Sequence, residues 1–274
     1  MDRIDRNAPI GVFDSGVGGL TVAREIIRQM PDERLVYFGD TARLPYGSKS
    51  RATVIRYSQQ IIRFLKTRKV KAIVVACNTA SAYALEAVER DSDIPVIGVI
   101  RAGARTAVHA TQNGKIGIIG TVGTISSGIY TEVMKQLKPD IEVTGKACPL
   151  LVPLVEEGLL HDSVTDEIAS RYLSELKGRY IDTLVLGCTH YPLPRSTIRR
   201  LMGEDVTLVN PAYETAMELK QLLAGSSLTC DPGLPEDGKY QFFVSDLAEK
   251  FTSFATSILP EEVKETRQIN IEEF

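Results

Sequence analysis

Two cysteines in this sequence of 274 residues stand in matched settings. Cys77 ends the apolar run 72–76 and is followed by Asn-Thr, and Cys188 ends the run 184–187 and is followed by Thr-His. Short apolar runs of this kind predict buried strands, so each thiol is expected where a strand ends. The repetition indicates two equivalent chemical roles, one in each half of the molecule.

Three kinds of chemistry could use these residues. A zinc site could combine Cys77, Cys188, His190 and a carboxylate, but the sequence has no C-x-x-C pair, and Cys-x-His is an uncommon ligand spacing. A cysteine nucleophile with His190 as its base would form a thioester, as in an amidohydrolase, and would leave the other thiol without a role. In a two-base proton transfer, one thiolate removes a proton from one face of a substrate carbon and the opposite thiol delivers a proton to the other face. This third chemistry uses both cysteines symmetrically and explains their repeated setting.

The positions of Cys77 and Cys188 favour reactivity over simple packing. Open α/β sheets bind their ligands at the carboxyl ends of strands. A helix is expected after each cysteine, and the dipole at a helix N-terminus favours the thiolate over the thiol. Cys148 and Cys230 lack this setting and are interpreted as small buried apolar residues.

Proton abstraction from carbon needs more than two thiols. A thiol has a reference pKa of about 8.5, far below that of an amino acid α-carbon, so the site must stabilise developing carbanion charge. Backbone amides at the expected helix starts supply part of this stabilisation. Carboxylates near each cysteine would move protons or tune the thiols, and Asp14, Asp40 and Glu156 are the candidates.

Strands and helices alternate along the first hundred residues. Strands are expected at 10–13, 35–38, 72–76 and 94–99, and helices at 20–30, around 54–65 and at 80–90. The first strand runs into residues 14–19, Asp-Ser-Gly-Val-Gly-Gly, which match neither the G-x-G-x-x-G nor the Walker A pattern. Asp14 and Ser15 therefore stand at the carboxyl end of a strand. The alternating order predicts a parallel sheet with right-handed crossovers.

The pattern then restarts. Residues 116–119, Ile-Gly-Ile-Ile, repeat the Ile-Gly opening of residues 10–13, and Thr121 stands where Ser15 stood. Further strands are expected at 141–143 and 184–186, and a loop at 152–158 that carries Glu156. Two helices are expected to bury residues 129, 133, 134 and 137 and residues 164, 168, 172 and 176, the second with Asp162 or Ser163 as its N-cap.

The last third is expected to rejoin the first domain. It reads as a strand at 206–209, a helix opened by Asn210-Pro211 and ending near 225, a strand at 240–244, a helix at 246–257 and a surface tail or edge element at 261–274. The predicted fold is an α/β protein of two pseudo-symmetric domains with mainly parallel sheets flanked by helices and an active site in the cleft between them. Residues 1–99 with 210–274 form the first domain, and residues 100–209 form the second.

The bulk composition is that of a globular protein. The chain is 43% hydrophobic and 24% charged, with a net charge of −3, which gives no general attraction to nucleic acid or anionic membranes. No apolar run reaches the roughly 18 residues that span a bilayer. The N-terminus lacks the apolar stretch of a signal peptide, and four cysteines do not form a disulfide framework. We therefore expect a cytoplasmic protein with free thiols.

Four motifs resemble those of the bacterial glutamate racemases. They lie at residues 14–19 (Asp-Ser-Gly-Val-Gly-Gly), 39–47 (Gly-Asp-Thr-Ala-Arg-Leu-Pro-Tyr-Gly), 76–80 (Ala-Cys-Asn-Thr-Ala) and 186–193 (Leu-Gly-Cys-Thr-His-Tyr-Pro-Leu). The resemblance extends from about residue 10 to residue 210, in order, and weakens in the last third. Aspartate and hydantoin racemases share the paired cysteines but usually lack the full second cysteine motif. Leu44 departs from many relatives, which affects the packing of its loop more than the chemistry.

The resemblance implies a racemase that interconverts L- and D-glutamate without a cofactor or metal and supplies D-glutamate for peptidoglycan synthesis. Cys77 would take the proton from D-glutamate and Cys188 from L-glutamate, with Asp14 assisting Cys77, His190 assisting Cys188, and Glu156 nearby. The substrate's carboxylates and ammonium group would be held by the short polar side chains and loop residues of the motifs, which are Asp14, Ser15, Pro45, Tyr46, Gly47, Asn78, Thr79, Thr121, Thr189 and His190.

The resemblance also implies a homodimer that binds neither nucleic acid nor membranes. Three other functions remain open at this stage: racemisation of aspartate, hydrolysis of a small amide by a cysteine nucleophile, and simple binding of an acidic amino acid between two lobes.

Overall fold

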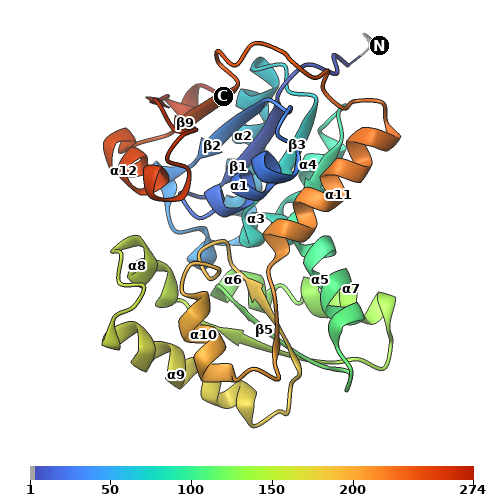
Figure 1. Ribbon diagram of the computed structural model, residues 1–274, viewed down its shortest axis with the longest axis vertical. Helices are drawn as coiled ribbons and strands as arrows, with labels where there is room; N and C mark the ends of the chain where they lie inside the picture. Colours follow the sequence, from blue (N-terminus) through green and yellow to red (C-terminus); the bar gives the residue numbers. More distant parts are fainter. Residues whose placement is uncertain (1–3) are drawn as a thin grey trace.

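The computed structural model describes residues 4–274 and contains two parallel β-sheets, each covered by helices on both faces (Figure 1). The larger sheet has the strand order β10-β9-β2-β1-β3-β4, and every neighbouring pair is parallel. Its strands are β1 (Ile10–Asp14), β2 (Leu35–Gly39), β3 (Ala72–Val75), β4 (Val96–Gly98), β9 (Tyr240–Val244) and β10 (Thr266–Gln268).

The inner strands β1, β2 and β3 are almost wholly apolar because helices cover both faces of the sheet. One face packs Ile10 and Val12 against α1 (Leu20–Gln29), α11 (Pro211–Gly225) and α12 (Ala248–Ile258). The other face packs Phe13 and Val75 against α2 (Arg51–Thr67), α3 (Asn78–Tyr83) and α4 (Leu85–Arg90). Three short 3-10 turns complete this part, and they are η1 (Thr41–Arg43), η2 (Tyr46–Ser48) and η3 (Ile271–Glu273).

The smaller sheet has the order β6-β5-β7-β8 and is also parallel throughout. Its strands are β5 (Lys115–Gly120), β6 (Glu142–Ala147), β7 (Thr183–Gly187) and β8 (Thr207–Val209). One face packs against α5 (Val99–Ala110) and α7 (Ile129–Leu137), and the other against α8 (Leu151–Glu156), α9 (Ser163–Lys177) and α10 (Arg195–Met202). A short helix, α6 (Val122–Ser126), follows β5.

The two sheets repeat one topology. The order β2-β1-β3-β4 in the larger sheet matches β6-β5-β7-β8 in the smaller one, so β1 corresponds to β5 and β3 to β7. This confirms the α/β class and the restart of the pattern at residue 116. The strands β9 and β10 extend the larger sheet on the side of β2. The segment 261–274 was expected to be a surface tail or an edge element, and it contains the edge strand β10. The domain boundaries expected near residues 99 and 209 stay a prediction.

The two halves meet at the carboxyl ends of their strands. In Figure 1, α3 and α6 lie between the two sheets, and α11 runs beside the upper sheet. Hydroxyl groups join the halves across this junction: Thr79 Oγ1 lies 2.8 Å from Thr121 Oγ1, and Tyr83 Oη lies 3.2 Å from Ser126 Oγ.

Several expected elements differ in detail. The helix expected at 80–90 is two helices, α3 and α4, that meet at Ala84. The expected loop at 152–158 is mostly the helix α8, so Glu156 ends a helix instead of lying in a loop. The helix α5 follows β4 directly and was not expected, because its run of alanines blurs the apolar period.

Two expected buried faces are rotated. In α7 the buried residues are Tyr130 and Met134, and Leu137 is 50% exposed. In α9 the buried residues are Thr165, Ala169, Leu173 and Leu176, one position away from three of the four expected. The expected caps Asp162 and Asn210 accept hydrogen bonds from the backbone amides of Val164 and Ala212. Across residues 4–274, no helix is long and apolar enough to cross a membrane.

Candidate active site

A small cavity between the two sheets brings the paired cysteines together. The expected site residues that line it come from four strand ends, the segments beside them and the end of α8. They are Ser15, Pro45, Tyr46, Gly47, Cys77, Asn78, Thr79, Thr121, Glu156, Cys188, Thr189 and His190. Leu44 and Val152, which were not singled out from the sequence as site residues, also line it. The cavity has a volume of about 30 Å³, room for about two water molecules. A larger ligand can therefore bind only if the residues that line the cavity move.

Strand register explains why the thiols converge. Phe13 pairs with Val75 in the larger sheet, so Asp14, Ser15 and Cys77 follow at the same edge. Gly120 pairs with Gly187 in the smaller sheet, so Thr121 and Cys188 follow there. The carboxyl ends of parallel strands meet at one edge of a sheet, and here the two edges face each other.

Cys77 holds its proton in this environment. It is 5% exposed and caps α3, accepting from the amide of Ala80 at 3.5 Å, and its sulfur lies 3.7 Å from Ser15 Oγ. Burial, followed by the charge of Asp14, raises the pKa of the Cys77 thiol to about 12. The expected preference for thiolate at a helix N-terminus is therefore wrong for the resting site, because desolvation outweighs the dipole of a helix only six residues long.

Asp14 does not line the cavity, although Ser15, the next residue, does. The carboxylate is fully buried, accepts from the amide of Gly16 at 2.9 Å, and lies 3.4 Å from Thr189 Oγ1 of the other half. Burial raises the pKa of Asp14, against the opposing effects of the charge of His190 and the amides of Gly16 and Gly19. Asp14 thus lies where the first half of the molecule meets the second cysteine motif.

Cys188 is joined to a hydrogen-bonded pair. Its sulfur lies 3.7 Å from His190 Nδ1, and His190 Nε2 lies 3.1 Å from Glu156 Oε1. Burial lowers the pKa of His190, but hydrogen bonds to Cys188 and Glu156 outweigh burial and raise this pKa to about 10. A positive imidazolium therefore lies beside the sulfur. No helix starts directly after Cys188, because α10 begins only at Arg195, so the charge of His190 takes the place of the expected helix dipole.

The glycine-rich turn after β1 lets the two halves approach closely. A Cβ atom on Gly18 would lie 2.3 Å from Thr189 Oγ1 and 2.6 Å from His190 Nδ1. Thr21 Oγ1 also lies 3.2 Å from the carbonyl oxygen of Thr189. The turn is therefore a packing surface for the second cysteine motif, a role that the turn's own sequence does not indicate.

Tyr130 is a residue of the site that sequence reasoning missed. Its hydroxyl donates to Asn78 Oδ1 at 2.8 Å, and the side chain is 2% exposed. With its oxygen engaged, the Asn78 amide group can offer its two N–H donors to the cavity that it lines. The helical pattern gave no signal for Tyr130, since it favoured Ile129 and Val133 as the buried residues.

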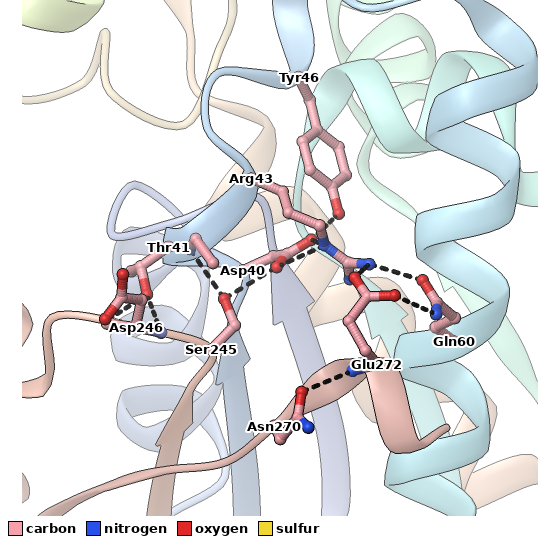
Figure 2. A network of polar contacts seen from close by, with 10 residues as sticks. Asp40, Thr41, Arg43, Tyr46, Gln60, Ser245, Asp246, Asn270 and Glu272 are labelled. Carbon is pink, nitrogen blue, oxygen red and sulfur yellow. Dashed lines mark hydrogen bonds and ion pairs between the residues drawn. The ribbon is translucent and has the colours of Figure 1, made fainter.

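The loop from Leu44 to Ser48 forms one wall of the cavity. Tyr46 is 1% exposed, and its hydroxyl donates to Asp40, which lies outside the cavity lining (Figure 2). Asp40 contacts neither thiol among its hydrogen bonds, so it is not placed to carry protons for them.

The zinc alternative has no support in the arrangement of ligands. Within the part of the chain that the structure describes, no three His, Cys, Asp or Glu side chains are grouped so as to hold a metal ion. What the cavity does contain is one protonated thiol, one thiol beside an imidazolium, and a ring of hydroxyl and amide donors. This equipment suits proton removal and delivery from two sides of one small molecule.

The family model described as Asp/Glu/Hydantoin racemase matches residues 10–219. The chain belongs to the Asp/Glu/Hydantoin racemase family. Among curated members, a protein named glutamate racemase from Geobacter metallireducens is 49% identical over 263 residues, which are 96% of this chain and 97% of the relative. The match to this racemase therefore includes the C-terminal third, where the motifs weaken.

Solved structures of the family have the same fold. A glutamate racemase from Bacillus anthracis superposes with a TM-score of 0.92 at 43% identity, covering 96% of this chain and 98% of that one. A glutamate racemase from Francisella tularensis, solved in complex with D-glutamate, has a TM-score of 0.91 at 37% identity, covering 98% of this chain and 100% of that one. Both support the two-sheet architecture described above.

Proposed function

We propose that this protein is a glutamate racemase that interconverts L- and D-glutamate by two-base proton transfer. The observation that carries the proposal is that Cys77 and Cys188, which follow corresponding strands of the two sheets, line the same small cavity. The near-full-length similarity to glutamate racemases supports glutamate as the substrate in preference to aspartate.

In the L-to-D direction, the sulfur of Cys188 acts as the base. The neighbouring imidazolium of His190, hydrogen-bonded to Glu156, favours the thiolate that takes the proton from the α-carbon. Cys77 holds a proton and delivers it to the opposite face of the carbanion. The reaction leaves Cys188 as the thiol and Cys77 as the thiolate, so protons balance within the pair.

The reverse reaction begins with Cys77 as the thiolate. Burial disfavours this state in the resting site, and the ammonium group of bound glutamate would add the positive charge that it needs. Backbone amides at the start of α3, with Asn78, Thr79 and Thr121, would hold the substrate's carboxylates and the developing carbanion charge. Asp14 would exchange protons on the Cys77 side, and Ser15, whose Oγ lies 3.7 Å from the sulfur, would hold the thiolate by its hydroxyl.

The position of the Glu156 carboxylate favours a role in tuning His190 over a direct contact with the α-carbon of the substrate. Glu156 reaches the imidazole from the far side of the ring and keeps 25% of its side chain exposed. Proton exchange between His190 and solvent would therefore pass through Glu156.

The proposal is tested by incubating the protein with L-glutamate in heavy water without added cofactor. We expect a racemic mixture, with deuterium at the α-carbon gained chiefly in the D-product at early times. Release of ammonia would instead identify an amidohydrolase, and unchanged L-glutamate would favour a binding protein. L-aspartate in a parallel incubation tests the alternative substrate, and faster racemisation of aspartate would overturn the assignment to glutamate.

We also propose that the protein acts in the cytoplasm as a homodimer and supplies D-glutamate for peptidoglycan. The dimer is tested by sedimentation equilibrium, and the cellular role by growth of D-glutamate-requiring cells that express this chain. A sedimentation result that shows a monomer at all concentrations would contradict the homodimer.

A further inference from the structure

Asp40 is a buried carboxylate that the proposed reaction does not use. It is fully buried at the end of β2, yet it lies outside the lining of the cavity. Its oxygens accept from Arg43 Nε at 3.0 and 2.8 Å, from Ser245 Oγ at 2.9 Å and from the hydroxyl of Tyr46. A buried charge with this many donors is held in one place, because losing any partner leaves it unsatisfied.

Tyr46 connects this carboxylate to the cavity. Burial, followed by the charge of Asp40, raises the pKa of Tyr46 well above its ordinary value. The hydroxyl therefore keeps its proton and donates a hydrogen bond to Asp40. Tyr46 lines the cavity together with its neighbours Leu44, Pro45 and Gly47. Its side chain therefore ties the loop to Asp40, the carboxylate that accepts from the Tyr46 hydroxyl.

Arg43 links Asp40 to Gln60 and Glu272, which lie nearer the surface. Its guanidinium binds Asp40 on one side, and on the other its Nη1 donates to Gln60 Oε1 at 2.5 Å and to Glu272 Oε1 at 3.2 Å (Figure 2). Its Cζ atom lies 4.0 Å from the ring centroid of Tyr57. Only 9% of the Arg43 side chain is exposed, so its orientation depends on these partners.

The last residues of the chain are fixed against α2. Asn270 Oδ1 accepts from the amide of Glu272 at 3.2 Å, Ile271 is 3% exposed, and the rings of Phe274 and Phe64 lie 5.3 Å apart. Gln60 Nε2 also donates to Glu272 Oε2 at 3.3 Å. The carboxylate of Glu272 is thereby presented to Arg43, although it is otherwise 66% exposed.

We propose that Asp40, Arg43, Ser245 and Glu272 are positioning residues that hold the cavity loop 44–48 through the hydroxyl of Tyr46, so that the C-terminal end of the chain contributes to substrate binding without touching the substrate. This inference rests on the proposed function, because the loop is taken to bind glutamate. It assigns a role to two segments, 240–246 and 270–274, that lie outside the motifs of the reaction.

The first test uses Tyr46→Phe and Arg43→Gln, assayed with both enantiomers. Each variant loosens the loop, which contacts the ground state and the transition state alike, so we expect KM to rise about three- to tenfold with kcat changed less than about twofold. Because both residues act through Asp40, the double variant should lose less than the product of the single effects. An unchanged KM in Tyr46→Phe, whose thermal unfolding and circular dichroism report an intact fold, would overturn the proposal.

The second test isolates the end of the chain. Glu272→Lys places a positive charge beside Arg43, whereas the matched variant Glu273→Lys makes the same change one residue away, where the carboxylate binds only Asn270 among the described side chains. We expect KM to rise at least about twofold in Glu272→Lys, less so at high salt, and to stay at the wild-type value in Glu273→Lys. Equal effects of the two variants, or none, would refute a role for Glu272.

The wild-type protein separates this inference from the proposed function. If it does not racemise glutamate, the proposed function fails and no KM comparison arises. If it is active, the variants alone decide the inference. Should Arg43→Gln fail to fold, the KM values of Tyr46→Phe and of the two lysine variants still support or overturn the role of the network.

Discussion

His190 Nδ1 lies 3.7 Å from the sulfur of Cys188, whereas the hydrogen-bond partners of the Cys77 sulfur are the hydroxyl of Ser15 and the amide of Ala80. The two thiols thus occupy corresponding strand ends with unequal acid–base equipment. Cys77 is a protonated donor at rest, and Cys188 has a cation beside it. This inequality gives the variants below different expected consequences.

Removing either thiol should abolish racemisation. We expect Cys77→Ala and Cys188→Ala each to lower kcat/KM at least about a thousandfold, because an essential proton donor or acceptor is lost. Cys230→Ala is the matched control, since that cysteine is also buried but contacts Asn7 and does not line the cavity. Near-normal activity in either active-site variant would end the two-base account.

Removing the imidazole should weaken both directions equally in kcat/KM. The enantiomers have the same free energy in water, so the ratio of kcat/KM for the two directions must stay at one. We expect His190→Asn to lower both values about a hundredfold and Glu156→Gln to lower them less, because Glu156 acts through His190. The rates are followed polarimetrically from each enantiomer. A larger effect of Glu156→Gln than of His190→Asn would show that Glu156 has a more direct role.

The proton on His190 should make the stability of the fold depend on pH. The folded-state pKa of about 10 exceeds the ordinary value of 6.5, so the folded protein binds this proton more tightly than the unfolded chain. Its stabilising effect is complete below about pH 6.5 and is lost as the pH rises towards about 10. We expect the Tm of the wild type minus that of His190→Asn to shrink across this interval. A difference that grows with pH would contradict the assigned pKa direction.

Adding a methyl group at Gly18 should lower kcat/KM more than it lowers the stability of the fold. In Gly18→Ala, the new methyl group would meet Thr189 and His190 at distances that force them to move. We expect kcat/KM to fall about ten- to a hundredfold, because small displacements of catalytic groups are costly. Gly225→Ala is the control, since a Cβ there has no neighbour within 4 Å. The comparison uses kcat/KM together with Tm for each variant, and equal kcat/KM in the two variants would show that close packing at Gly18 does not matter.

Sequence patterns were most informative where local structure decides. Apolar runs such as 72–75 are buried on both faces in a parallel sheet that helices cover on both sides. Asn210 and Pro211 start a helix by local interactions, because the Asn210 side chain accepts a hydrogen bond from the amide of Ala212 and proline suits the first helical position. Both were predicted correctly. The helical faces of α7 and α9 were not, because residues such as Leu137 and Val164 are apolar without being buried, and only the packing of neighbouring elements decides which stripe faces inward.

The convergence of the site was predictable in outline, since the polar residues after parallel strands must meet at one edge of a sheet. By itself, the sequence determined two copies of one strand-and-helix pattern and a thiol at the same place in each. Only the tertiary structure decided that the two edges face each other across a cavity of about 30 Å³. It also decided the state of Cys77, because burial beside Asp14 raises a thiol pKa that its helix would lower. The links from Tyr130 to Asn78 and from Glu272 to Arg43 join residues distant in the chain, so no local pattern records them.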